Sequence, residues 1–189
     1  MAIENEVKIR VDELDHLRAT LLRLKPRVIA ARHFEDNYSL DFPDGRIRSR
    51  GCLLRVRITR DTALLTFKEA ARVGGPFKTR EELETPLPDG RTVLEILRRV
   101  GFQVWFHYQK YREEFSITLG SKAGNEVHVA LDETPVGTFV ELEGPEDSVR
   151  KVAGKLGFSE AQFMRDSYYA LYIRFCQERG QEPRHMIFG

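Results

Sequence analysis

The chain has 189 residues, of which 41% are hydrophobic and 31% charged, and this composition predicts one globular domain with its own buried core. The 30 Lys and Arg residues nearly balance the 29 Asp and Glu residues, whereas a dedicated nucleic-acid binder usually carries a basic excess. Cys52 and Cys176 show no metal-ligand spacing, and neither an apolar signal region nor a membrane-spanning run is present. We therefore expect a cytoplasmic protein without a nucleic-acid or membrane partner.

The first half of the chain predicts strands with one helix among them. Residues 2–11 alternate strictly, with Glu4, Glu6, Lys8 and Arg10 on one parity and Ile3, Asn5, Val7, Ile9 and Val11 on the other, which is the period of a strand with one charged face. A leucine stripe from Leu14 to Leu24 then predicts a helix that ends near Pro26. The segment 27–41 is compatible with a strand pair or with a strand and a loop. Three further strands are expected at 52–60, 63–69 and 78–85.

The second half adds three helices and three strands. A helix is expected over 90–100, another from Pro145, and a last one from Asp166 or Ser167 to about Arg179, with Tyr169 among its buried residues. Strands are expected at 102–118, 126–132 and 138–143. The order predicts one α+β domain over residues 1–179, with about eight antiparallel strands and helices packed outside. Residues 180–189 form an irregular tail.

Strong charges recur on one parity of at least six strands, while the opposite parity is apolar. A single charged strand face usually just faces water. Repetition favours a barrel whose apolar parity packs against helices and whose charged parity lines the interior. The acidic members are Glu4, Glu6, Glu82, Glu84, Asp132, Glu141 and Glu143, and the basic members are Lys8, Arg55, Arg57, Lys68, Arg80, Lys110 and Arg112.

A charged barrel interior must be wet and must hold ions, because uncompensated buried charges destabilise a fold strongly. Carboxylate clusters are ligands for hard cations such as Mg²⁺ or Mn²⁺. Arg and Lys side chains suit a polyanion that is rich in phosphate oxygens. The sequence therefore predicts a combined metal and polyphosphate site.

The order of the charged motifs resembles that of a known family. Glu4-Asn5-Glu6-Val7-Lys8 matches a Glu-x-Glu-x-Lys motif on a first strand. Its companions follow in order: Leu54-Arg55-Val56-Arg57, Thr66-Phe67-Lys68, Arg80-Glu81-Glu82-Leu83-Glu84, Lys110-Tyr111-Arg112, Leu131-Asp132, Val140-Glu141-Leu142-Glu143-Gly144 and Ser167-Tyr168. The set resembles the CYTH family, or triphosphate tunnel metalloenzymes, which includes class IV adenylyl cyclases, thiamine triphosphatases and inorganic triphosphatases.

The resemblance implies a closed eight-stranded antiparallel β-barrel that forms a triphosphate tunnel. It implies that divalent metals are approached by Glu4, Glu6, Asp132, Glu141 and Glu143, with Glu82 and Glu84 nearby. It implies that the triphosphate is gripped by Lys8, Arg55, Arg57, Lys68, Lys110 and Arg112, to which we add Arg80. Many members carry a Lys near the Ser-Tyr pair, and here Arg165 is either its substitute or a surface residue. Lys8, flanked by Glu4 and Glu6, would touch phosphate or assist proton transfer, which makes these three the candidate catalytic residues.

Three functions remain open at this point. The first is metal-dependent hydrolysis of inorganic triphosphate, thiamine triphosphate or a nucleoside triphosphate. The second is a class IV adenylyl cyclase that converts ATP to cyclic AMP and pyrophosphate. Such cyclases often carry a His-Phe pair before the first motif, and this chain begins too close to its motif to hold one, which lowers this expectation without excluding it. The third is a polyphosphate- or nucleotide-binding module without turnover, although anion binding alone needs fewer carboxylates. Selectivity would rest on loops near 42–51 and 70–77, and a homodimer is compatible with the sequence.

Overall fold

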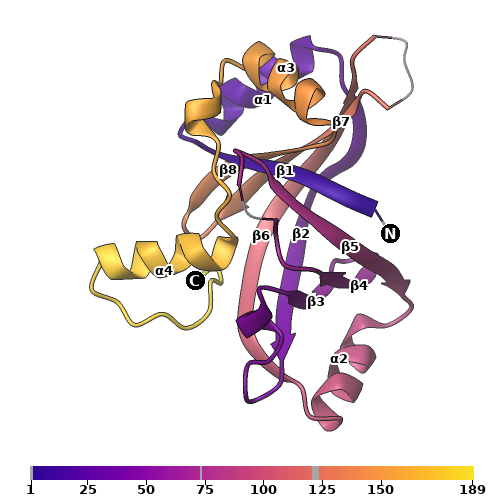
Figure 1. Cartoon of the computed structure of the whole chain (residues 1–189), viewed down its shortest axis with the longest axis vertical. Coiled ribbons are helices and arrows are strands. Elements are labelled where there is room, and N and C mark those ends of the chain that lie inside the picture. The colour runs from indigo at the N-terminus through magenta and orange to yellow at the C-terminus, as the bar shows by residue number, and fades with distance from the viewer. Residues whose placement is uncertain (1, 73, 121–123) are drawn as a thin grey trace.

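The computed structural model describes residues 2–72, 74–120 and 124–189, and eight strands in this part close into one antiparallel barrel (Figure 1). The order around the barrel is β1-β5-β4-β3-β2-β6-β7-β8, and β8 pairs with β1 to close it. The predicted closed eight-stranded barrel is confirmed. The strands are β1 (Ala2–Val11), β2 (Arg27–Asp41), β3 (Leu53–Ile58), β4 (Ala63–Lys68), β5 (Lys78–Leu87), β6 (Gln103–Thr118), β7 (Glu126–Thr134) and β8 (Gly137–Glu143).

Helices pack outside the barrel, as the sequence predicts. α1 and α3 lie together over one end, α2 packs on the other end against β3, β4 and β6, and α4 extends from the side (Figure 1). Ser167 caps α4, since its hydroxyl accepts a hydrogen bond from the Ala170 amide at 3.1 Å. In the described residues the helices are α1 (Leu14–Arg23), α2 (Gly90–Arg99), α3 (Glu146–Lys155) and α4 (Tyr168–Glu178), with 3-10 turns η1 (Arg48–Arg50) and η2 (Glu160–Gln162). None of these helices is long and apolar enough to cross a membrane.

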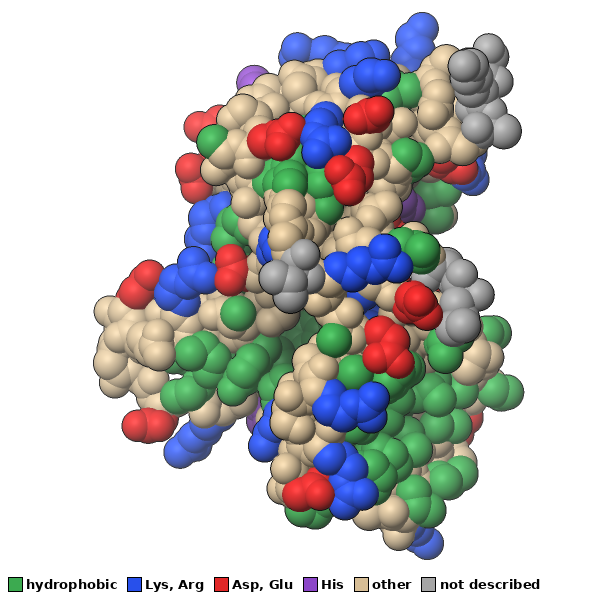
Figure 2. Space-filling model, viewed as in Figure 1, with side chains coloured by type: hydrophobic (Ala, Val, Ile, Leu, Met, Phe, Trp, Pro, Cys, Tyr) green, Lys and Arg blue, Asp and Glu red, His purple; other side chains and the backbone are tan. Residues whose placement is uncertain are grey.

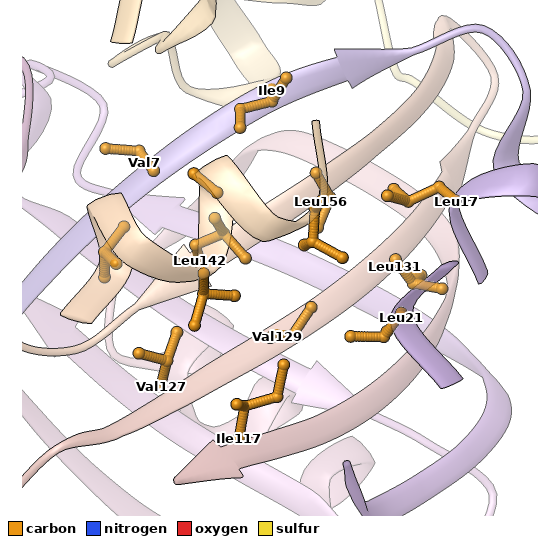
Figure 3. Packing of buried hydrophobic residues seen from close by; sticks show 14 of the residues in the cluster. Val7, Ile9, Leu17, Leu21, Ile117, Val127, Val129, Leu131, Leu142 and Leu156 are labelled. Atoms are coloured by element: carbon orange, nitrogen blue, oxygen red, sulfur yellow. The ribbon is translucent and has the colours of Figure 1, made fainter. Parts of the chain in front are cut away.

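The largest hydrophobic core lies between the barrel wall and the pair α1 and α3, not inside the barrel (Figure 3). The outward parity of the strands supplies Val7, Val129 and Leu142, each with no exposed surface. Leu21 of α1 and Leu156 at the end of α3 close this core from the helical side. Because the apolar parity is used outside, the charged parity is left to line the lumen.

The segment 27–41 is one continuous strand rather than a strand pair or a strand and a loop. Its pairing with β6 shifts register between Val28 and Ala30, between Ala30 and His33, and between Ser39 and Leu40. Such shifts mark β-bulges, which interrupt the alternation of side chains. They explain why period-two analysis did not resolve this strand.

The C-terminal part packs more closely than an irregular tail suggests. Met186 is 1% exposed, and its backbone exchanges hydrogen bonds with His107 and Gln109 of β6 at 3.0 and 2.9 Å. In α4, the buried tyrosine is Tyr168 at 7% exposure. Tyr169, expected to be buried, is 40% exposed. The helix begins at Tyr168, and the side chain of Tyr168, not that of Tyr169, turns toward the barrel.

Exposed hydrophobic side chains also occur on the barrel, over the part of the surface that carries β5 and α2 (Figure 2). Leu83 of β5 is 52% exposed and Ile96 of α2 is 53% exposed. On the same face, basic and acidic side chains are interspersed rather than gathered by sign (Figure 2).

We predict that Leu142→Ala lowers the free energy of unfolding by about 3 kcal/mol, because it leaves a cavity in the core between β8 and α3. Leu83→Ala removes the same atoms from an exposed site and should change stability by less than about 0.5 kcal/mol. Urea unfolding followed by far-UV circular dichroism measures both. Equal losses in the two variants would contradict the placement of the core outside the barrel.

Candidate active site: a charged tunnel

The lumen of the barrel forms a cavity of about 1020 Å³. It is lined by the inward parity of the strands, by the loop before β3 and by the start of α4. Figure 2 shows the molecule hollowed between α4 and the lower part of the barrel. The cavity brings together nearly all the predicted site residues: Glu4, Glu6, Lys8, Arg55, Arg57, Lys68, Arg80, Glu82, Glu84, Lys110, Arg112, Glu141, Glu143 and Arg165.

Asp132 of β7 does not line the cavity but lies buried behind it, at 0% exposure. Arg112 donates to both of its carboxylate oxygens, at 2.7 and 2.6 Å, and Lys110 donates at 3.1 Å. Tyr168 of α4 donates its hydroxyl to the same carboxylate. The Asp132 oxygens, expected to approach a metal, are thus occupied by three protein donors that they orient.

Glu35 of β2 is a central site residue that the sequence analysis missed. It is 1% exposed and lies 3.4 Å from both Arg57 and Lys110. Burial disfavours its charged form, but Lys110, Arg57 and Arg112 outweigh burial and hold the pKa of Glu35 well below its usual range. This carboxylate therefore stays ionised and fixes three cations on the lumen wall.

Lys8 of β1 lies deep in the tunnel, at 2% exposure. Its ammonium is 2.8 Å from Glu141 and 3.4 Å from Glu6, and it sits 4.3 Å from the centre of the Tyr168 ring. Burial alone would lower the pKa of Lys8, but the Glu141 and Glu6 carboxylates more than offset it and raise that pKa above its ordinary value. Lys8 therefore remains charged at neutral pH.

Glu4, Glu6 and Glu143 form a carboxylate cluster on β1 and β8. Glu6 and Glu143 are directly opposite in the strand register, where like charges destabilise a sheet. Burial, together with the charges of Glu4 and Glu6, raises the pKa of Glu143 to about 7. Lys68 neutralises part of this charge, at 2.8 Å from both Glu4 and Glu82. Buried oxygen donors with excess negative charge fit a hard divalent cation.

Among the described residues, the group whose possible metal-ligand atoms all lie within 4.8 Å of one another is His33, Glu35 and Glu114, and not Glu4, Glu6 and Glu143. Its central carboxylate is Glu35, which already balances three cations, so a metal there would meet strong repulsion. His128 also lines the cavity and lies 3.0 Å from Glu114.

Several basic groups on the cavity wall have hydrogen-bonding capacity to spare. Among the described residues, the Nε atoms of Arg55 and Arg80 are buried without a hydrogen-bond acceptor. Arg55 is held by the Tyr108 hydroxyl, to which it donates at 3.0 Å. Lys78, another lining residue that the sequence analysis missed, has its pKa lowered to about 8, chiefly by burial. Buried donors of this kind are normally satisfied, so they indicate an anion site in the tunnel.

Arg165 holds one rim of the tunnel together. Its guanidinium donates to the backbone carbonyls of Arg72 and Gly75, at 2.5 and 3.4 Å. It therefore ties Arg72 and Gly75 to the segment before α4, and it also lines the cavity.

Residues 2–168 match the family model of the CYTH domain. The chain belongs to the CYTH family. The match covers the whole barrel and ends at Tyr168, so it includes every strand that contributes a charged side chain to the tunnel. The CYTH motifs read from the sequence are thus the elements that the fold brings to one lumen.

The CYTH relatives differ in name and share the architecture. A Methanocaldococcus jannaschii protein provisionally named an adenylate cyclase is 25% identical over 180 residues, covering 89% of this chain and 98% of its own length. A Vibrio parahaemolyticus structure, also provisionally assigned as an adenylate cyclase, has a TM-score of 0.75 at 20% identity and covers 89% of this chain and 97% of its own. A Hippeastrum protein assigned as an adenylyl cyclase, and described as having a dominant triphosphatase activity, has a TM-score of 0.66 at 16% identity, with coverages of 97% and 98%. At these identities the structural matches show the fold.

We predict that Glu35→Gln lowers the free energy of unfolding by about 3–5 kcal/mol at pH 7, because it leaves buried cations without their carboxylate. The folded pKa of Glu35 lies below the ordinary 4.5, so its contribution is present above that pH and is lost as the pH falls. The difference in the free energy of unfolding between wild type and Glu35→Gln should therefore narrow below about pH 4.5.

The matched control is Glu133→Gln, which removes an ion pair with Arg32 on the outer face of the barrel. Glu133→Gln should lower the free energy of unfolding by less than about 1 kcal/mol. Denaturant unfolding from pH 3 to pH 8 measures both variants. A Glu35→Gln protein as stable as wild type at pH 7 would show that this carboxylate does not organise the lumen.

Proposed function

We propose that the tunnel binds a triphosphate-containing small molecule and hydrolyses it with the help of Mg²⁺ or Mn²⁺. The observation that most supports this is one cavity that combines buried donors of Arg55 and Arg80 without acceptors and the crowded carboxylates of Glu6 and Glu143. The family to which the chain belongs includes triphosphatases and adenylyl cyclase-like enzymes. Such enzymes agree with a site that has both basic donors for phosphate and carboxylates for a metal.

The basic residues of the cavity would hold the phosphate chain. Arg55, Arg57 and Arg80 present planar guanidinium groups, which pair with two phosphate oxygens at once. Lys68, Lys110 and Arg112 add charge from β4 and β6, and Arg165 closes the rim. Because Asp132 and Glu35 hold Lys110 and Arg112 in place, these donors need little rearrangement when the charge on phosphate rises in the transition state.

The carboxylates of Glu4, Glu6 and Glu143 would hold the metal, with Glu82 and Glu84 at the neighbouring wall. Glu141 is engaged by Lys8 and Arg112, so in our proposal it joins Asp132 in orienting the basic residues. Bound there, divalent ions supply polarised phosphoryl oxygens and a water of lowered pKa.

The chemical step is attack by water oxygen on the terminal phosphorus. A new P–O bond forms, the bridging P–O bond breaks, and the remaining diphosphate leaves with the negative charge that the basic residues neutralise. The proton of the water passes to the carboxylates of the cluster and then to solvent. The raised pKa of Lys8 supports a role in charge neutralisation, because a charged ammonium cannot accept that proton.

The adenylyl cyclase remains the second candidate, since proteins of M. jannaschii and V. parahaemolyticus with this fold carry that provisional name. In this reaction the ribose 3′ hydroxyl replaces water and attacks the α-phosphorus, and pyrophosphate leaves. The same basic residues would hold the phosphate chain in this reaction, and the same carboxylates would hold the metal. The Hippeastrum protein, assigned as a cyclase, has a dominant triphosphatase activity, so this fold alone does not decide between the two nucleophiles.

We predict orthophosphate release from at least one of inorganic triphosphate, ATP and thiamine triphosphate with Mg²⁺ or Mn²⁺, and loss of this activity in EDTA. Ion chromatography of the products measures orthophosphate and cyclic AMP in one sample. Cyclic AMP and pyrophosphate from ATP, without orthophosphate, would overturn hydrolysis in favour of the cyclase. Tight triphosphate binding with no product would favour a binding module.

A second prediction concerns the carboxylate cluster. Glu6→Gln should lower the activity by more than about 100-fold, because even the loss of an outer partner of a metal site costs 10- to 100-fold. Raising the Mn²⁺ concentration should restore part of the rate, since the defect is in metal affinity. The control Glu113→Gln removes a carboxylate that pairs with Arg18 on the outer surface, and it should keep wild-type activity. Unchanged turnover in Glu6→Gln would remove this residue from the metal ligands.

A further inference from the structure

Trp105 of β6 enters the tunnel through a break in the strand register. Ser39 of β2 pairs with Phe106, and the next residue, Leu40, pairs with Val104, so Trp105 is an extra residue on β6. Val104 packs on the outer cluster under α2, and Phe106 lines the cavity. Strict alternation allows only one of two neighbours to face inward, but the bulge turns both Trp105 and Phe106 to the cavity.

The bulge places Trp105 at a rim of the tunnel that combines aromatic rings with a cation. The Trp105 ring meets Tyr169 of α4 edge-on, with centroids 4.9 Å apart and an interplanar angle of 80°. The Arg48 guanidinium lies 5.5 Å from the Trp105 ring centre. Tyr169 and Arg48 also line the cavity, and both are substantially exposed.

The loop that carries Arg48 is held in a fixed shape from below. Asp41, 1% exposed, accepts hydrogen bonds from the backbone amides of Phe42, Ile47 and Arg48 at 2.8, 2.9 and 3.0 Å. Gly45 has a φ of 70°, and a Cβ there would lie 2.9 Å from the Arg48 Nε atom. A glycine at this position therefore leaves the room in which the Arg48 side chain lies at the rim.

The cavity is larger than a phosphate chain alone requires. Its volume of about 1020 Å³ stands at the upper end of the range of sites that enclose whole small molecules. Ionic groups line its interior, whereas Trp105, Phe106 and Tyr169 line this rim. Inorganic triphosphate has no group that could use an aromatic rim.

We propose that Trp105, Tyr169 and Arg48 form a subsite for a planar heteroaromatic ring joined to the triphosphate, as in the base of a nucleoside triphosphate. Aromatic side chains bind such rings by stacking, and Arg48 adds a cation over the same surface. Tyr108 lies three positions after Trp105 on β6, a separation of about 10 Å in a strand. Tyr108 holds Arg55, so a ring at the rim and phosphates at Arg55 fit one extended ligand.

The proposal rests on triphosphate binding in the tunnel and adds the choice of what the triphosphate carries. Trp105 is the only tryptophan of the chain, so its fluorescence reports directly on the subsite. We expect ATP with Mg²⁺ to quench this fluorescence saturably, and inorganic triphosphate to leave it nearly unchanged. Thiamine triphosphate serves as a second heteroaromatic arm, which tells a purine site from a site for another ring.

Trp105→Ala should raise KM for ATP by about 5- to 100-fold, the range that corresponds to the loss of one stacked base. It should change KM for inorganic triphosphate by less than about twofold, and Trp105→Phe should restore most of the ATP affinity. The matched control is Tyr111→Ala, since Tyr111 lies on the same strand but stacks with Phe188 and Arg32 outside the cavity. This control should alter neither KM.

The outcomes separate the subsite from the proposed function. If ATP quenches Trp105 but no triphosphate is hydrolysed, the subsite stands and hydrolysis fails. If Trp105→Ala raises KM for ATP and for inorganic triphosphate equally, or for neither, the subsite is overturned while hydrolysis stands. If no triphosphate binds by fluorescence or calorimetry, both are overturned.

Discussion

The ion-pair cluster around Arg112 is the interaction on which the rest of the tunnel depends. Its guanidinium lies between Asp132 and Glu141, with Glu35 at 4.0 Å, so it joins β6 to β7, β8 and β2. Burial alone would lower the pKa of Arg112, but the three carboxylates hold it well above its ordinary value. Such a cluster is stable only while every charge keeps its partners, because an unpaired buried ion is costly. The core must therefore form elsewhere, and it forms outside the barrel.

Charge balance inside the lumen also links the two ligands of the proposed site. Acidic and basic side chains there are nearly matched, as they are in the whole chain with its formal charge of +1. A triphosphate alone would make the lumen strongly negative near Glu4, Glu6 and Glu143. A divalent cation alone would add charge beside Lys68 and Arg80. Binding both at once reduces each imbalance, so metal and triphosphate should each raise the affinity for the other.

The sequence predicted the barrel because period two survives wherever the register is regular. In β1, β3 and β8 the charged residues alternate with mostly apolar ones. The predicted inward charges of these strands line the cavity, namely Glu4, Glu6, Lys8, Arg55, Arg57, Glu141 and Glu143. It failed at Glu35, because register shifts interrupt β2 and both of its parities mix polar and apolar residues. It missed Lys78, although this residue begins the predicted strand 78–85 and shares the parity of Arg80, Glu82 and Glu84, so the signal was present in the sequence. Trp105 was hidden for the same physical reason as Glu35, since a bulge reverses the parity that alternation assigns.

In the proposed site, the triphosphate and the group attached to it would be bound by two different kinds of structure. The proposed phosphate site uses side chains on paired strands, whose positions the barrel closure fixes, and Tyr168, which ties α4 to Asp132. The rim comes from a bulge, a loop and the exposed start of a helix, which can change without disturbing the pairing of the strands. Relatives with 16–25% identity can therefore keep the same tunnel while the group attached to the triphosphate differs. In this chain Trp105 and Arg48 are the residues at which such a difference would be decided.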